Sequence, residues 1–267
     1  MALLPLPLAL ALTASPVQAS TADFEVVQLS ESFYCEGASY GDINGDGALD
    51  IVSGPFWYEG PEWQTAHEIY EPKLHDPLGY SDNFFVFLLD MNGDQRVDIF
   101  RIGFPGQDAT WHENPGATRG HWKTHQVFDH VDNESPTLID ITGDGRPELV
   151  CNSAGAFGYA EGNWQSPADP WTFHPISENL KKGRFTHGLG VGDINGDGRP
   201  DVLEAQGWWE HPAQRQAWQT WVHHPFPFST RGGGAQMLVH DFDGDGDADV
   251  ASSLWAHGFG LSWFEQV

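Results

Sequence analysis

Basic residues and cysteines are scarce in this chain of 267 residues. Only 12 Lys and Arg stand against 38 Asp and Glu, which gives a formal net charge of −26. Nucleic-acid backbones and anionic membrane surfaces both attract clustered Lys and Arg, so this charge argues against either partner. The two cysteines, Cys35 and Cys151, are too few for the disulfide scaffold of a small secreted domain.

Long apolar segments and helical periodicity are also missing. Beyond residue 20 no segment is apolar enough to span a membrane, and none of convincing length repeats its apolar residues with the helical period. A hydrophobic share of 40% and 12 Trp nonetheless exclude a disordered acidic chain. We therefore expect a folded protein with many carboxylates in defined places.

Residues 1–19 have the composition of a secretory signal peptide. The stretch from Ala2 to Ala14 is apolar, and Val17-Gln18-Ala19 suits cleavage after Ala19, although no Lys or Arg precedes the stretch. The alternative, a buried N-terminal helix, is disfavoured by two prolines within the stretch. We expect an exported protein, secreted or periplasmic.

One nine-residue motif recurs five times and explains much of the acidity. It has the form Asp-x-Asn-Gly-Asp-Gly-x-x-Asp, and its copies start 48, 50, 53 and 48 residues apart. The five copies hold 17 of the 38 acidic residues. They begin at Asp42, Asp90, Asp140, Asp193 and Asp241.

Oxygen-bearing side chains at positions 1, 3, 5 and 9, with a glycine at position 6 for the turn, suit a hard cation such as Ca²⁺. An EF-hand would need Glu at position 12, where only Glu204 fits. Gln95 replaces the position-6 glycine in the second copy, and the third copy departs at positions 3 and 9, so these two sites should bind most weakly. The predicted ligands of up to five structural Ca²⁺ ions are Asp42, Asn44, Asp46, Asp50, Asp90, Asn92, Asp94, Asp98, Asp140, Thr142, Asp144, Glu148, Asp193, Asn195, Asp197, Asp201, Asp241, Asp243, Asp245 and Asp249.

The segments around each motif predict an all-β fold. A short β-type run precedes and follows each loop, an aromatic strand comes third, and a strand that begins with Trp and carries a His comes fourth. Four strands in about 50 residues form one propeller blade. We predict a five-bladed β-propeller of four-stranded blades. The chain ends on a third strand, so we expect Phe24–Leu29 to complete the last blade and close the ring.

These motifs resemble the FG-GAP/VCBS repeat family, the calcium-loop propellers found in integrin α-subunits and in many secreted bacterial proteins. The resemblance covers residues 23–267 and implies a single β-propeller domain with structural calcium in each blade. Integrin rings contain more blades than this chain supplies, so integrin function is not implied. The family includes adhesion modules as well as sugar lyases and dehydratases.

The repeat also separates structural from functional residues. Four histidines recur in the fourth strands and are expected to be structural: His67, His125, His174 and His223. Polar groups that differ between blades are better candidates for function, and one channel mouth should gather Glu36, Asp82, Glu134, His187 and His257 as candidate catalytic residues. The candidate ligand-binding residues around them are Trp57, Asn83, Trp208, Gln236 and Trp255.

Two classes of function fit this pattern. The first is a secreted, calcium-stabilised module that binds carbohydrate or a protein surface through an aromatic-lined channel face. The second is a sugar-directed lyase, dehydratase or isomerase in which His187, His257 and Glu134 act as acid and base or hold a further divalent metal. A solvent-filled channel without either function is the remaining alternative. The sequence slightly favours binding, because propellers without chemistry are common and the fold alone cannot decide.

Overall fold

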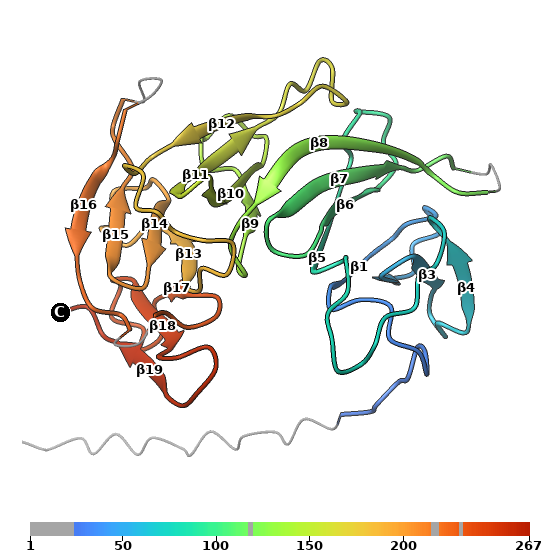
Figure 1. Cartoon of the computed structure of the whole chain (residues 1–267), viewed down its shortest axis with the longest axis horizontal. Coiled ribbons are helices and arrows are strands. Elements are labelled where there is room, and N and C mark those ends of the chain that lie inside the picture. Colours follow the sequence, from blue (N-terminus) through green and yellow to red (C-terminus); the bar gives the residue numbers. More distant parts are fainter. Residues whose placement is uncertain (1–23, 117–119, 215–218, 230–231) are drawn as a thin grey trace, which may run out of the picture.

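The computed structural model describes residues 24–116, 120–214, 219–229 and 232–267. Within them all regular secondary structure is β, with 19 strands arranged in five antiparallel sheets along an open arc (Figure 1). No helix among these residues has the length and apolarity to cross a membrane. The predicted signal peptide, residues 1–19, lies outside the described residues.

Each sheet follows chain order, with its first strand toward the inside of the arc and its last strand outside (Figure 1). Sheet 1 contains β1 (Ala38–Gly41), β2 (Asp50–Ser53), β3 (Phe56–Glu59) and β4 (Thr65–Glu68). Sheet 2 contains β5 (Phe85–Leu89), β6 (Asp98–Ile102), β7 (Gln107–Glu113) and β8 (Lys123–Val131). Sheet 3 contains β9 (Thr137–Ile139), β10 (Glu148–Ser153), β11 (Ala156–Glu161) and β12 (Thr172–Pro175). Sheet 4 contains β13 (Leu189–Gly192), β14 (Asp201–Glu204), β15 (Gly207–Glu210) and β16 (Val222–Pro225), and sheet 5 contains β17 (Leu238–His240), β18 (Asp249–Ser253) and β19 (Leu261–Phe264).

The acidic motif joins the first and second strand of every sheet, so the predicted hairpins are present. Position 9 of the motif is always the first residue of the second strand, where it pairs with the last residue of the first strand, as Gly41 does with Asp50. The strands that follow are rich in β-branched and aromatic residues, which suit a pleated surface packed on both sides. A repeated loop therefore sets a repeated register.

Neighbouring sheets pack face to face through four hydrophobic clusters. Sheets 1 and 2 bury Val52 against Ile99, and sheets 2 and 3 bury Phe100 and Trp111 against Leu149. The remaining two clusters join sheet 3 to sheet 4 and sheet 4 to sheet 5. Each core thus lies between two sheets rather than inside one.

The predicted ring closure is not confirmed among the described residues. Phe24–Leu29 forms no strand, and sheet 5 has only β17, β18 and β19 among the described residues. A closed ring of five sheets needs five interfaces, but none of the four clusters joins sheet 5 to sheet 1. The packing angle that these four interfaces set leaves an opening between the ends of the arc (Figure 1). The all-β propeller-like architecture is confirmed, whereas a closed five-bladed ring is not.

Gln95 keeps the loop of sheet 2 in the same turn as the glycines of the other loops. Its φ of 68° lies in the left-handed region, where the position-6 glycines Gly47, Gly145, Gly198 and Gly246 have φ between 85° and 102°. A side chain with a Cβ is strained in this region, and glycine is not. The departure from the motif therefore costs stability without changing the turn.

Replacing Gln95 with glycine should stabilise the protein. The relief of left-handed strain, less the entropy that glycine adds to the unfolded chain, gives an expected gain of about 0.5–1 kcal/mol. Urea unfolding followed by tryptophan fluorescence measures the change. A loss of stability in Gln95→Gly would mean that the Gln95 side chain makes a favourable contact that outweighs the strain.

Truncation of Phe100 tests the interface between sheets 2 and 3. Phe100 is fully buried in the cluster with Leu149 and Trp171, so Phe100→Ala should cost about 3–5 kcal/mol of unfolding free energy. Leu78→Ala is the matched control, because Leu78 is 96% exposed and its loss should change stability by less than about 0.5 kcal/mol. Equal effects in the two variants would contradict this packing.

Candidate functional site

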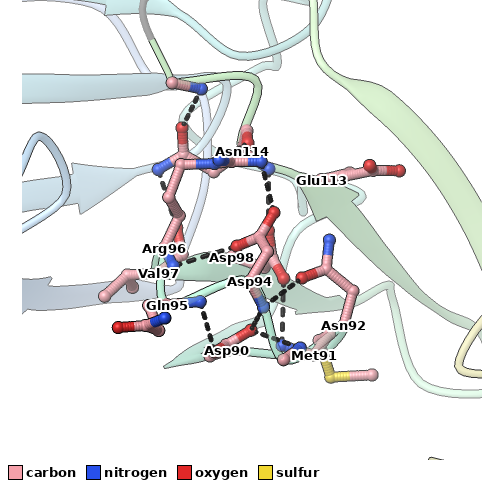
Figure 2. A network of polar contacts seen from close by, with 12 residues as sticks. Asp90, Met91, Asn92, Asp94, Gln95, Arg96, Val97, Asp98, Glu113 and Asn114 are labelled. Atoms are coloured by element: carbon pink, nitrogen blue, oxygen red, sulfur yellow. Dashed lines mark hydrogen bonds and ion pairs between the residues drawn. The ribbon is translucent and has the colours of Figure 1, made fainter. Parts of the chain in front are cut away.

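A buried carboxylate at position 9 links each acidic loop to the rest of its sheet. In sheet 2 the two oxygens of Asp98 accept hydrogen bonds from the backbone N–H groups of Met91, at 2.9 Å, and Asn114, at 2.7 Å (Figure 2). Met91 lies in the loop and Asn114 follows the third strand. The same two bonds are made by Asp50, Asp201 and Asp249 in sheets 1, 4 and 5. Position 9 thus has a structural role in addition to the predicted role in metal binding.

The remaining motif oxygens turn toward the backbone of their own loop. Asp90 accepts from the N–H groups of Gly93 and Asp94 through Oδ1 and from that of Gln95 through Oδ2 (Figure 2). The Oδ1 atom of Asn92 accepts from Asp94 N–H at 3.0 Å. Equivalent bonds recur in the other loops, which gathers oxygen atoms at the loop tip.

The acidic loop of sheet 5 has side chains arranged in a way that could hold a metal ion. Carboxylate oxygens of Asp241, Asp243 and Asp249 all lie within 4.8 Å of one another, a spacing that one cation could bridge. They form the only such group of three acidic, His or Cys ligands among the described residues. Hard carboxylate oxygens are the donor set that Ca²⁺ prefers, so these residues fit that ion.

Burial and mutual repulsion raise the pKa of several loop carboxylates. The pKa of Asp98 and of Asp201 is raised to about 6, first by desolvation and then by the neighbouring loop aspartates. Burial and the nearby Asp144 and Asp140 raise the pKa of Glu148 to about 7. A bound cation would offset this repulsion, because an opposite charge favours the ionised carboxylate.

The histidines of the fourth strands form a repeated structural unit. His67 stacks on Trp57 with ring centroids 4.1 Å apart, and its Nε2 lies 3.0 Å from Glu59. His125 and His174 make the same pair of contacts in sheets 2 and 3, which confirms their structural role. In sheet 4 the equivalent residue is His224 rather than the expected His223. Trp57 and Trp208 therefore stack on histidines of the fourth strands and pack against the clusters between sheets.

Three of the five predicted catalytic residues do converge. His187 Nδ1 lies 3.2 Å from Glu134 Oε2, and His187 Nε2 lies 3.0 Å from His257 Nε2. We call Glu134, His187 and His257 the mouth cluster. Glu134 precedes β9, His187 precedes β13 and His257 lies between β18 and β19, so three sheets build one site.

Backbone contacts hold these three segments together. The N–H of Glu134 donates to the carbonyl of Thr186 at 3.1 Å, beside His187. Gly233, which precedes sheet 5 in the chain, packs on the same segment so closely that a Cβ there would lie 2.4 Å from the carbonyl oxygen of His187. The triple glycine at residues 232–234 therefore has a packing role at this point.

The donor and acceptor roles along Glu134, His187 and His257 determine how the mouth cluster can hold a proton. The Glu134 carboxylate only accepts, so His187 must carry a proton on Nδ1, which leaves its Nε2 as an acceptor when the ring is neutral. His257 Nε2 then donates to it. When His187 is protonated, Glu134 stabilises the cation and the His187 Nε2–H points to His257. The array can hold and pass one proton, with His187 between its two partners.

Glu36 and Asp82 lie apart from the mouth cluster. Glu36 accepts from the backbone N–H of Ser81 at 3.1 Å and also contacts the Ser81 hydroxyl. Asp82 lies 3.0 Å from Lys73 Nζ and 3.4 Å from His75 Nε2. Burial raises the pKa of Asp82 and the cations lower it, and the net shift is downward. These two carboxylates thus form separate contacts between sheets 1 and 2.

Two exposed aromatic residues lie close in sequence to the histidines of the mouth cluster. Trp255 is 38% exposed and lies two residues before His257, with its ring packed on Gly258. Phe185, two residues before His187, is 48% exposed and contacts Phe104. The guanidinium of Arg184 lies 4.7 Å from the Phe185 ring centroid. Sequence reasoning missed Phe185 and Arg184, although three basic residues within Lys181–Arg184 are conspicuous in a chain with so few.

The two remaining candidate ligand residues differ in exposure. Asn83 is buried, donates to the Tyr70 hydroxyl and accepts through its carbonyl from Glu36 and Gly37, so it joins sheets 1 and 2. Gln236 is exposed and forms a bridge with Leu189 at the start of β13. A cleft does occur elsewhere, between sheets 1 and 2, where it is lined in part by Trp57, His67 and Arg96.

Comparison with solved structures finds similar folds within larger proteins. The chain resembles the rhamnogalacturonan lyase YesW, with 13% identity, a TM-score of 0.50 and coverage of 86% of this chain and 48% of that one. The exotype rhamnogalacturonan lyase YesX gives 15% identity, a TM-score of 0.50 and coverage of 86% and 47%. An Agrocybe aegerita lectin that recognises non-reducing terminal N-acetylglucosamine gives 19% identity, a TM-score of 0.48 and coverage of 81% and 60%. The chain thus spans about half to three fifths of the length of these proteins.

Comparison by sequence gives one family. No curated protein matches the chain. The model of the FG-GAP-like repeat matches residues 90–151, which run from the acidic loop of sheet 2 into β10 of sheet 3. The family resemblance drawn from the acidic motifs is therefore confirmed, and this chain carries an FG-GAP-like repeat.

Proposed function

We propose that this chain is an exported, calcium-stabilised protein that binds carbohydrate at the mouth cluster. The observation that carries the proposal is the meeting of Glu134, His187 and His257 from three sheets, with the exposed Trp255 and Phe185 each two residues along the chain from one of these histidines. Sugars offer apolar ring faces that stack on aromatic side chains and hydroxyls that bind to charged or imidazole groups. The mouth cluster and the aromatic residues next to it in the chain offer both kinds of contact.

The positive charge of Arg184, three residues before His187, favours a polar ligand. Arg184 stacks on Phe185 and Phe104, which leaves its guanidinium to donate to ligand oxygens. YesW and YesX, whose fold this chain shares, are lyases of a polysaccharide, and a carbohydrate ligand agrees with that fold. A protein surface as ligand is the alternative, and a carbohydrate-binding experiment separates the two.

A second function, acid–base catalysis on a sugar, is favoured by one specific contact. Glu134 orients His187 and stabilises its protonated form, as a residue that supports a general base does. In an elimination, His187 would take the proton next to a carbonyl or carboxylate group, and the electrons of that C–H bond would form the new C=C bond. The C–O bond on the neighbouring carbon would break with its electrons moving to the leaving oxygen, which would take a proton from a protonated His257. Accumulation of unsaturated sugar, followed by ultraviolet absorbance, measures this activity.

Removal of the aromatic platform should weaken carbohydrate binding. Trp255→Ala removes a stacking surface, and losses of about 1–3 kcal/mol are usual for an aromatic contact of this kind, so the affinity should fall at least fivefold. Calorimetric titration with a panel of polysaccharides measures the change. Tyr40→Ala is the control, since Tyr40 is an exposed aromatic residue of sheet 1, 73% exposed, and is not part of the mouth cluster. Equal binding by both variants would place the ligand elsewhere.

Calcium removal should destabilise the fold. A ligand that binds only the native state stabilises it by mass action, so chelation should lower the melting temperature by several degrees, and Ca²⁺ but not Na⁺ should restore it. In the loop of sheet 5, the double variant Asp241→Ala/Asp243→Ala should bind one Ca²⁺ fewer per chain, whereas Asp247→Asn at position 7 should bind as many as the unaltered protein. A melting curve that chelation leaves unchanged would contradict the assignment of calcium to these loops.

A further inference from the structure

Sheet 5 ends on an exposed third strand. Leu261 and Trp263 of β19 are 83% and 50% exposed, whereas Trp111, which holds the place of Trp263 in sheet 2, is 1% exposed. In sheets 1–4 a fourth strand covers this edge, and no fourth strand does so for β19 among the described residues. An unpaired edge with exposed apolar residues readily accepts another strand.

The fourth strands of the other sheets show what the missing strand should look like. Each supplies a histidine that lies opposite the aromatic residue of the third strand, as His174 does opposite Tyr159 and His224 opposite Trp208. An aliphatic residue follows two positions later in sheets 1–3, at Ile69, Val127 and Ile176. In sheets 2, 3 and 4 a Trp stands three positions before that histidine.

Phe24–Leu29 has this pattern except for the histidine. Aligned with Trp171–Ile176, it has an aromatic residue, Phe24, at the first position and an aliphatic residue, Leu29, at the sixth, with Val27 in place of His174. Phe24 and Val26 are each 93% exposed, and the segment forms no strand. An apolar segment of this kind in water has a free-energy reason to pair.

The chain that follows this segment is fixed to the far end of the arc from β19. The N–H of His75 donates to the carbonyl of Phe33 at 3.0 Å, and the ring of Tyr34 contacts that of Phe56 in sheet 1. The opening of the arc separates sheet 1 from sheet 5 (Figure 1). Pairing within one chain would require this opening to close and the four packed clusters to rearrange. Pairing between two chains leaves all four as they are.

We propose that Phe24–Leu29 of one copy forms the fourth strand of sheet 5 in a second copy, and that the exchange is reciprocal. A reciprocal exchange gives a closed dimer with twofold symmetry and leaves neither β19 edge exposed. The register follows from sheets 3 and 4, with Val27 opposite Trp263 and Gln28 opposite Ser262. This interface is independent of the mouth cluster and of its ligand.

A designed disulfide distinguishes exchange between copies from pairing within one chain. Gln28→Cys and Ser262→Cys place two thiols opposite each other in the expected register, close enough for a disulfide. Mild oxidation should give a covalent dimer on a non-reducing gel, and neither single variant should, which also controls for Cys35 and Cys151. A cross-linked monomer would overturn the proposal, because it would show ring closure within one chain. Failure to form any cross-link would also overturn it.

Mass in solution provides the second test. Light scattering in calcium should give a dimer for the unaltered protein and a monomer for Val26→Pro/Val27→Pro, because proline removes the N–H groups that pair with β19. Glu31→Pro, just outside the segment, is the matched control and should remain dimeric. In sheets 1–4 a histidine contacts the aromatic residue and the Glu of the third strand, and Val27→His would supply such a histidine to Trp263 and Glu265. This variant should tighten the dimer roughly two- to fivefold. A monomeric unaltered protein, or a Val27→His variant with weaker association, would contradict the exchange.

Discussion

The buried carboxylate at position 9 is the contact on which the rest of this structure depends. Asp50, Asp98, Asp201 and Asp249 each bind one N–H in the acidic loop and one N–H just after the third strand. A buried charge is tolerated only when its hydrogen bonds are satisfied, so this side chain fixes three strands and their register at once. In sheet 3 the longer Glu148 binds only within its loop, through the N–H groups of Ile141 and Thr142.

Regular sheets allow the site to be built from irregular positions. Because the same loop joins the first and second strands of every sheet, the residues just before the first strands and between the second and third strands lie at the opposite end of each sheet. Most of these positions hold packing groups, and in sheets 3, 4 and 5 they hold Glu134, His187 and His257. The repeat supplies the frame, and the three side chains that depart from it supply the chemistry of binding or proton transfer.

Local features of this fold could be predicted from the sequence, and features that depend on packing angle could not. The hairpins follow from the acidic motif, and the structural histidines follow from their recurrence with Trp and Glu. The choice between His223 and His224 depended on a register that adjacent histidines leave open. Ring closure depended on the angle between sheets, which the sequence does not encode in any motif. The stacking of Trp57 on His67 and of Trp208 on His224 also depends on the strand register, so the sequence alone did not show it.

Hydrogen exchange at the amides that donate to position 9 tests the central claim most directly. In sheet 4 these are the N–H groups of Ile194 and His211, which lie outside the strands but bind the buried Asp201. If the carboxylate holds the sheet together, both amides exchange as slowly as the amides of β14, and Asp201→Ala removes their protection while Met91 and Asn114 of sheet 2 keep theirs. Exchange of Ile194 and His211 at the rate of exposed loop amides in the unaltered protein would contradict the account.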